Sequence, residues 1–151
     1  MTEENFSFRS WLSNGERGKT LQELEKQDWG DGSYFPSHLV LTTHALRRKL
    51  LEEFTVEDLR IMIGQNIGLE YLVPLAIEYL QHDPFVAGDF YEGDLLANVL
   101  SVEASFWQRY PDLRRVIAHI VETISPLPKI FHKALLTFQQ NSGQAEQTSS
   151  S

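Results

Sequence analysis

The stretch FTVEDLRIMIGQNIGLEYLVPLAIEYLQHDP, residues 54–84, decides the fold of this 151-residue chain. At its start, Thr55 is followed three residues later by Asp58, and the apolar residues Phe54 and Leu59 flank this pair. A hydroxyl that accepts from the backbone N–H three residues on, with an acid that reaches back, is a capping box, and the apolar pair is a hydrophobic staple. The pattern predicts that a helix begins at Thr55.

A second helix is predicted soon after the first, over residues 69–82. One face of it is apolar at helical spacing, which is typical of a helix that packs on a core. The residues of this face are Leu69, Leu72, Val73, Ala76, Ile77 and Leu80. Pro74 cannot donate a backbone hydrogen bond, so we expect either a kink at Pro74 or a helix whose true first turn is there. The first helix should end near residues 66–68, where a glycine permits a left-handed cap.

The sequence on both sides continues the helical pattern. Upstream, Thr20 and Glu23 form another capping box, a loop follows over residues 28–36, and Ser37 caps a further helix that should carry Arg47-Arg48-Lys49 in its last turn. Downstream, helices are expected over residues 94–100, 102–108 and 111–124, and again after Pro126 and Pro128. No segment alternates as a strand would. We therefore predict an all-α fold, a single compact domain of about seven helices over residues 20–140.

The two ends of the chain are polar. Residues 1–19 contain Asn14-Gly15 and Gly18 and are expected to form a loosely ordered N-terminal arm. Residues 141–151, NSGQAEQTSSS, are predicted to be a disordered tail. The acidic start without an apolar run predicts no secretion signal, and no window is apolar enough for a membrane span. With no cysteine in the sequence, we expect a cytoplasmic protein.

The negative charge is concentrated in the centre of the chain. The net charge is −8, and residues 51–94 hold ten acidic residues against Arg60 alone, whereas the other residues carry 12 basic and 11 acidic side chains. Such a segment repels nucleic acid and anionic membranes and attracts basic partners. A solvated surface that keeps the protein soluble is the simpler interpretation of the same charges.

Motifs for catalysis and metal binding are absent from the sequence. It contains no GxGxxG, P-loop, GxSxG or HExxH pattern. His38 and His44 are six residues apart, which does not place them on one helical face as a spacing of four would. The pair Glu57 and Asp58 lies in a first helical turn, where acids are expected in any case. We therefore predict that the protein is not an enzyme and has no catalytic residues, no metal site and no cofactor.

The loop over residues 83–94 is the best candidate for a binding surface. It combines four acids with Phe85, Phe90 and Tyr91 between glycines, and interface hot spots favour aromatic anchors that surrounding carboxylates can help a basic partner to reach. A connector whose aromatic side chains turn into the core explains the loop equally well. The residues that we predict at a partner interface are Glu70, Glu78, Asp83, Asp89, Tyr91, Glu92 and Asp94.

Residues 44–102 resemble the immunity proteins of bacterial contact-dependent growth inhibition (CDI) systems. The resemblance is densest in FTVEDLRIMIGQNIGL, residues 54–69, and in GDFYEGDLLANVL, residues 88–100. The upstream segment TLQELEKQDWG, residues 20–30, is similar to that family too. Together these segments cover about 80 of the 151 residues.

The resemblance implies a partner rather than a substrate. Proteins of this family bind the C-terminal toxin domain of a CDI effector in the cytosol and block it, often by covering its active site. Many such toxins are nucleases, which are commonly basic because they hold phosphates. The resemblance thus implies a heterodimer with a basic toxin domain, while the negative charge predicts no binding of nucleic acid or membrane. A helical adaptor for a basic partner unrelated to toxins is the main alternative, and an enzyme with an unfamiliar carboxylate or histidine site is a third.

Overall fold

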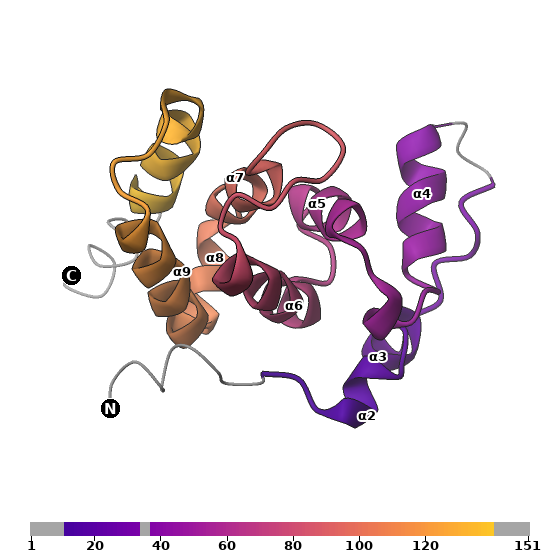
Figure 1. Cartoon of the computed structure of the whole chain (residues 1–151). Coiled ribbons are helices and arrows are strands. Elements are labelled where there is room, and N and C mark those ends of the chain that lie inside the picture. The colour runs from indigo at the N-terminus through magenta and orange to yellow at the C-terminus, as the bar shows by residue number, and fades with distance from the viewer. Residues whose placement is uncertain (1–10, 34–36, 141–151) are drawn as a thin grey trace.

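The computed structural model describes residues 11–33 and 37–140, and all regular elements within these ranges are helical (Figure 1). The elements are α2 (Asn14–Arg17), α3 (Leu21–Glu25), α4 (His38–Leu46), η1 (Leu51–Glu53), α5 (Val56–Gly64), α6 (Leu69–His82), α7 (Asp94–Leu100), α8 (Ala104–Arg109), α9 (Pro111–Thr123), η2 (Lys129–Phe131) and a last helix over residues 132–140. The predicted all-α class is confirmed. The expectations for residues 1–10 and 141–151 lie outside the described residues.

The described residues contain nine α-helices, more than the predicted number of about seven. One helix that the sequence analysis did not predict is α2, a single turn that begins with a capping box. The hydroxyl of Ser13 accepts from the backbone N–H of Glu16 at 3.1 Å, and the Glu16 carboxylate accepts from the Ser13 N–H at 2.8 Å. The Ser-x-x-Glu pattern signals this turn, whereas the nearby glycines indicate a loose arm.

The predicted start of α5 is confirmed. Thr55 accepts from the Asp58 N–H at 3.1 Å, and Asp58 accepts from the Thr55 N–H at 3.0 Å. The helix ends at Gly64, before the predicted end at residues 66–68. Asn66 takes the left-handed conformation there, with φ 55°, and the two backbone bonds of a Schellman motif close the turn. Gly68 is also left-handed, but it stands at the N-terminus of α6.

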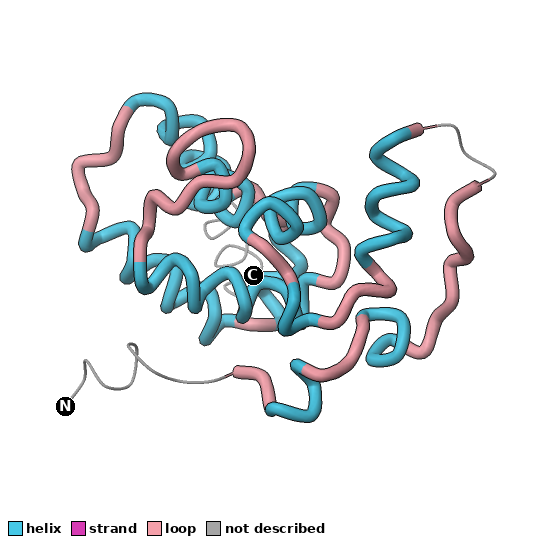
Figure 2. The backbone as a smooth tube through the Cα atoms, turned by 45° about the vertical axis from the view of Figure 1, so that its right-hand side comes forward, coloured by secondary structure: helices cyan, strands magenta, loops and turns pink. Residues whose placement is uncertain are grey.

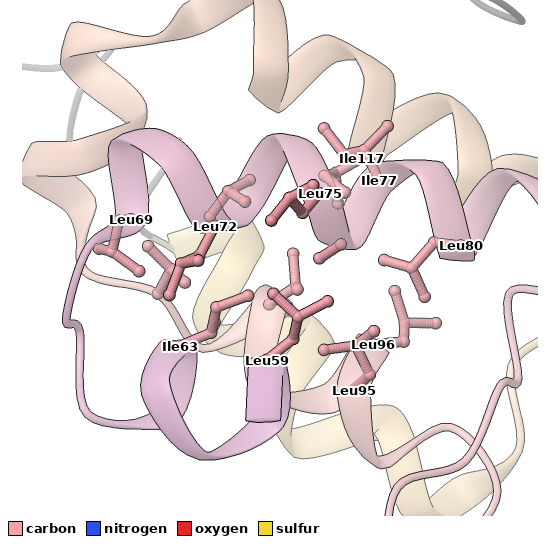
Figure 3. Packing of buried hydrophobic residues seen from close by; sticks show 14 of the residues in the cluster. Leu59, Ile63, Leu69, Leu72, Leu75, Ile77, Leu80, Leu95, Leu96 and Ile117 are labelled. Atoms are coloured by element: carbon pink, nitrogen blue, oxygen red, sulfur yellow. The ribbon is translucent and has the colours of Figure 1, made fainter. Parts of the chain in front are cut away.

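Helix α6 lies at the centre of the core (Figure 3). All six residues of its predicted apolar face are buried, as are Pro74 and Leu75. The helix is this widely buried because α5, α7 and α9 all pack against it. The alternative that α6 truly begins at Pro74 is wrong, since α6 runs from Leu69 through Pro74 to His82. Burial of its large apolar side chains stabilises the fold by roughly 1.5–3 kcal/mol each.

Helix α4 stands at the edge of the molecule, and its end differs from the prediction. The helix ends at Leu46, so Arg47 is its C-cap and Arg48 and Lys49 lie beyond it. The helix dipole favours cations at this end of a helix, but it does not account for Arg47, because the side chain is only 1% exposed and forms an ion pair with Glu25.

Helix α5 lies between α4 and the loop that joins α6 to α7, as both backbone views show (Figures 1 and 2). Two neighbouring acids in the first turn of α5 connect it to both sides. Asp58 pairs with Lys49, just after α4, at 2.6 Å. Glu57 accepts from the backbone N–H of Asp89 in the loop at 2.8 Å.

Among the described helices, none combines the length and the apolar character that a membrane span requires.

Candidate protein-binding surface

The loop between α6 and α7 is held in shape by the first residue of α7, Asp94. This residue is only 2% exposed. Its carboxylate accepts from the backbone N–H groups of Gly88 at 2.6 Å, Phe90 at 3.0 Å and Tyr91 at 3.4 Å. A carboxylate that satisfies several backbone donors of one loop makes strong, charge-assisted bonds. The predicted interface residue Asp94 is therefore buried, and it organises the loop instead of reaching a partner.

Arg60 of α5 connects this loop to the helical bundle. Its Nε donates to Glu57 at 2.6 Å, a second guanidinium nitrogen pairs with the same carboxylate, and a carboxylate oxygen of Asp94 lies 3.8 Å from Nε. The Arg60 hydrogen bond lowers the pKa of Glu57, and the backbone N–H of Asp89 lowers it further, against the opposing effect of burial. Glu57 is therefore ionised at neutral pH and holds the loop through its charge.

Neither Glu57 nor Arg60 was among the predicted site residues. Their spacing of three on one helix signals that they can pair with each other. Nothing in the sequence signals that Glu57 reaches a loop 32 residues further along the chain. The structure thus joins the two segments of the sequence that gave the densest resemblance, residues 54–69 and 88–100.

The aromatic side chains of the loop divide between surface and core. Phe90 is 71% exposed and lies over the Arg60 guanidinium, with 3.9 Å between the guanidinium carbon and the ring centroid. Tyr91 is also exposed. Phe85 instead packs against Phe131, with ring centroids 5.7 Å apart. Phe85 therefore turns into the core, as the connector interpretation predicts, whereas Phe90 and Tyr91 remain at the surface.

The acidic side chains add a negative field around the exposed rings. Asp89 and Glu92 are exposed on either side of Phe90 and Tyr91. Asp83, at the end of α6, is exposed as well, and it accepts from the Phe85 N–H at 3.0 Å. We use the name acidic loop for residues 83–94. Together with Glu57 and Arg60, it contains five carboxylates and one guanidinium.

The two remaining predicted interface residues lie on α6, away from the exposed part of the acidic loop. Glu78 pairs with Arg17 of α2 at 3.1 Å, on the rim of a cavity of about 350 Å³ that Tyr79 and His82 also line. Glu70 is two turns earlier and lines a different cavity. The structure therefore brings Asp89, Tyr91 and Glu92 together, with Asp83 at the base of the loop, but not Glu70 or Glu78.

The cavity beside Glu70 has a volume of about 240 Å³ and is also lined by Tyr71 and Tyr110. Burial raises the pKa of both tyrosines, and the negative charge of Glu70 raises it further. Both phenols are therefore protonated at neutral pH. Within residues 11–33 and 37–140, no three histidine or acidic side chains come close enough to hold a metal ion.

Comparison with known proteins connects this arrangement to one family. A family model of the CDI immunity proteins matches residues 23–117, which is more than half of the chain. The matched region extends from α3 into α9 and includes the acidic loop, Glu57 and Arg60. No curated protein sequence matches the chain.

Proposed function

The chain belongs to the CDI immunity proteins, and from this premise we propose that it neutralises a basic nuclease toxin by covering the active site of that toxin. The family membership already makes it an immunity protein against a CDI toxin. The nuclease character of the toxin, the contact surface and the occlusion are our proposal. In it, the two proteins form a heterodimer in the cytosol of the cell that makes the toxin.

The observation that carries the proposal is the exposed, rigidly held acidic loop. A nuclease holds phosphates, so its active site is basic. The acidic loop offers Asp89 and Glu92 to such a site, next to the exposed ring of Phe90. Opposite charges steer the two proteins together, and an aromatic anchor contributes to the affinity once water is excluded.

Rigidity favours this surface over an ordinary solvated loop. The backbone of the acidic loop is tied to Asp94 and Glu57, so little conformational freedom remains to be lost on binding. Ordering a flexible loop reduces affinity, whereas a surface already in its bound shape avoids that cost. We therefore propose Asp83, Asp89, Tyr91 and Glu92 as contacts and add Phe90. Glu70 and Glu78 remain proposed contacts on α6.

The test uses the toxin domain of the same CDI system. Co-expression with the chain should restore growth, and the purified pair should bind tightly, with an affinity that falls as salt is raised. The nuclease activity of the toxin on RNA and DNA should fall in proportion to the amount of complex formed. A toxin that stays active on small and large substrates while bound would contradict occlusion of the active site.

A charge-matched pair of variants tests the contact surface. The double change Asp89→Asn with Glu92→Gln should weaken binding by on the order of 10-fold at low salt and flatten its salt dependence. Glu103→Gln with Glu122→Gln removes the same charge from exposed positions elsewhere and is the control. Equal effects of the two double variants would show that total charge, rather than the acidic loop, determines binding.

A further inference from the structure

Helix α4 stands at the edge of the molecule (Figure 1), and two of its leucines are exposed. Its sequence, HLVLTTHAL, contains no acidic residue, lysine or arginine. Leu39 is 42% exposed and Leu41 is 41% exposed. A helix at a protein surface normally carries charged or polar residues on its solvent side. On α4, leucines occupy two of these solvent-exposed positions.

The two exposed leucines lie on opposite sides of α4. Positions that are two apart in the sequence, such as 39 and 41, point roughly 200° apart around the axis of a helix with 3.6 residues per turn. Leu39 shares a face with Thr43 and Leu46, which follow it by four and seven residues. Thr43 and Leu46 are both buried against the body of the protein. The inner, core-facing side of α4 thus continues one turn beyond the part that the rest of the chain covers.

This uncovered turn lies on the same side of the molecule as the acidic loop. Figures 1 and 2 both show the beginning of α4 and the loop rising on either side of α5. The contacts of α5 agree with this view, since Asp58 pairs with Lys49 next to α4 while Glu57 holds Asp89 of the loop. One protein that binds over α5 could therefore touch both.

The acidic loop alone is too small for a stable interface. A standard interface covers about 800 Å² on each partner and uses roughly 20–30 residues a side. The acidic loop has only twelve residues, and Gly93 and Asp94 among them are buried. The toxin must therefore contact further regions of the surface.

We propose that the inner face of α4 around Leu39 is a second contact surface for the same toxin domain. It would receive an apolar patch that borders the basic region of the toxin. The inference rests on the proposed function, because the acidic loop fixes where the toxin sits. Charge determines which part of the toxin each surface binds. The acidic loop attracts the basic region, while the uncharged α4 accepts the apolar patch without desolvating a charge.

The experiment compares Leu39→Asp with Leu41→Asp in the full-length protein. Both changes place one negative charge at equally exposed positions of the same helix, but only Leu39 lies on the inner face. Leu39→Asp should weaken toxin binding by on the order of 30-fold and reduce growth rescue, while Leu41→Asp should change neither. Equal losses for both variants, or none for Leu39→Asp, would overturn the proposal.

A second measurement tests the contact at position 39 without Leu39→Asp, which could weaken binding by unfolding α4 locally. A photo-crosslinking amino acid at position 39 should link to the toxin, and the same amino acid at position 41 should not. Sedimentation of the free protein distinguishes another occupant of this face. A wild-type dimer that becomes a monomer in Leu39→Asp would show that a second copy covers the face, and the proposal would be wrong.

Failure of this inference is distinguishable from failure of the proposed function. If Leu39→Asp binds normally while Asp89→Asn with Glu92→Gln binds weakly, the acidic loop contacts the toxin and α4 does not. If the wild-type chain neither binds nor neutralises the toxin domain, the proposed function itself is wrong for that pair.

Discussion

Trp29 and Phe90 are exposed aromatic side chains that each lie on an arginine, but only Phe90 belongs to the surface that we propose for toxin binding. Trp29 covers the guanidinium of Arg47 at 4.0 Å, and Phe90 covers that of Arg60 at 3.9 Å, measured from the guanidinium carbon to the ring centroid. Each arginine is also paired with a carboxylate. The contacts between the side chains are thus alike in both regions.

The difference lies in how deeply each pair is buried. Arg47 is 1% exposed, pairs with Glu25, and donates to the backbone carbonyl of Gln27 at 2.7 Å. Its Nε is buried without a hydrogen-bond partner among the described residues. Trp29 therefore covers a buried arginine that belongs to the fold itself. Phe90 instead exposes most of its ring to solvent, which leaves it available for the toxin contact that we propose.

Loss of the Arg47 side chain should destabilise the fold strongly. Arg47→Ala should lower the free energy of unfolding by about 3 kcal/mol, because it removes one partner of a buried pair and the packing of the arginine stem. We place the loss at the lower end of the usual range because the Glu25 side chain is 29% exposed and can regain water. Urea unfolding followed by circular dichroism measures the change.

Arg115→Ala is the control for this change. Arg115 also pairs with an acid, Asp112, but both side chains are well exposed, and such surface pairs contribute about 0–1 kcal/mol. A loss below about 1 kcal/mol for Arg47→Ala would mean that the buried pair is no more important than the exposed one. The distinction drawn between the two arginine–aromatic regions would then be wrong.

The second effect concerns Phe90 and should appear in binding rather than in stability. Phe90→Ala should weaken toxin binding by about 2 kcal/mol, which is the size expected for an aromatic hot spot. The free energy of unfolding should change by less than about 0.5 kcal/mol, since the ring is mostly exposed. Titration calorimetry with the toxin domain measures the first quantity, and urea unfolding measures the second.

Leu136→Ala is a suitable control for Phe90→Ala. Leu136 is another strongly exposed apolar side chain, and it lies in the last helix, outside the acidic loop and outside the matched family region. It should leave toxin binding unchanged. If Phe90→Ala lowers stability and leaves binding intact, Phe90 acts like Trp29 and the two regions do not differ in function.

A third, smaller effect tests whether Arg60 acts on binding through Phe90. Arg60→Met keeps an apolar stem but removes the guanidinium, and it should weaken toxin binding about 10-fold, or 1.4 kcal/mol. In a Phe90→Ala background the same change should have much less effect, because the ring that Arg60 positions is gone. Additive losses in this double-mutant cycle would show that Arg60 contributes to binding independently of Phe90.

Local signals made the helices predictable. The capping boxes at Thr20 and Thr55 and the apolar spacing of residues 69–82 each depend on neighbours within a few residues, and the structure contains all of these features. The end of α5 was less predictable because Asn66, rather than a glycine, takes the left-handed position. Which residue takes the left-handed position after a helix depends on local details that composition does not reveal.

The organisation of the candidate site depends on distant contacts and was largely not predictable. Charge and aromatic content singled out residues 83–94, but they did not show that Asp94 turns inward to bind three backbone N–H groups. The burial of Arg47 was also missed, because a basic triplet after a helix has a simpler explanation in the helix dipole. Only tertiary structure separates the carboxylates that hold the loop from those that face solvent.

The smallest effect concerns the carboxylate that ties the acidic loop to α5. Glu57→Gln should lower the free energy of unfolding at pH 7 by about 1 kcal/mol, since it removes the charge from the hydrogen bonds to Arg60 and Asp89. The folded-state pKa of Glu57 lies below its ordinary value of 4.5. Its stabilisation is therefore present above pH 4.5 and is lost as the pH falls through the lowered folded-state pKa.

The stability difference between wild type and Glu57→Gln should accordingly be constant from pH 7 to about pH 5 and shrink below that. Urea unfolding at several pH values measures it, with Glu103→Gln, an exposed acid outside the acidic loop, as the control. A difference that stays constant down to pH 3 would show that the ionised form of Glu57 is not what stabilises the loop. The rigidity of the acidic loop would then come from Asp94, and the contrast with the Arg47 region would rest on that carboxylate alone.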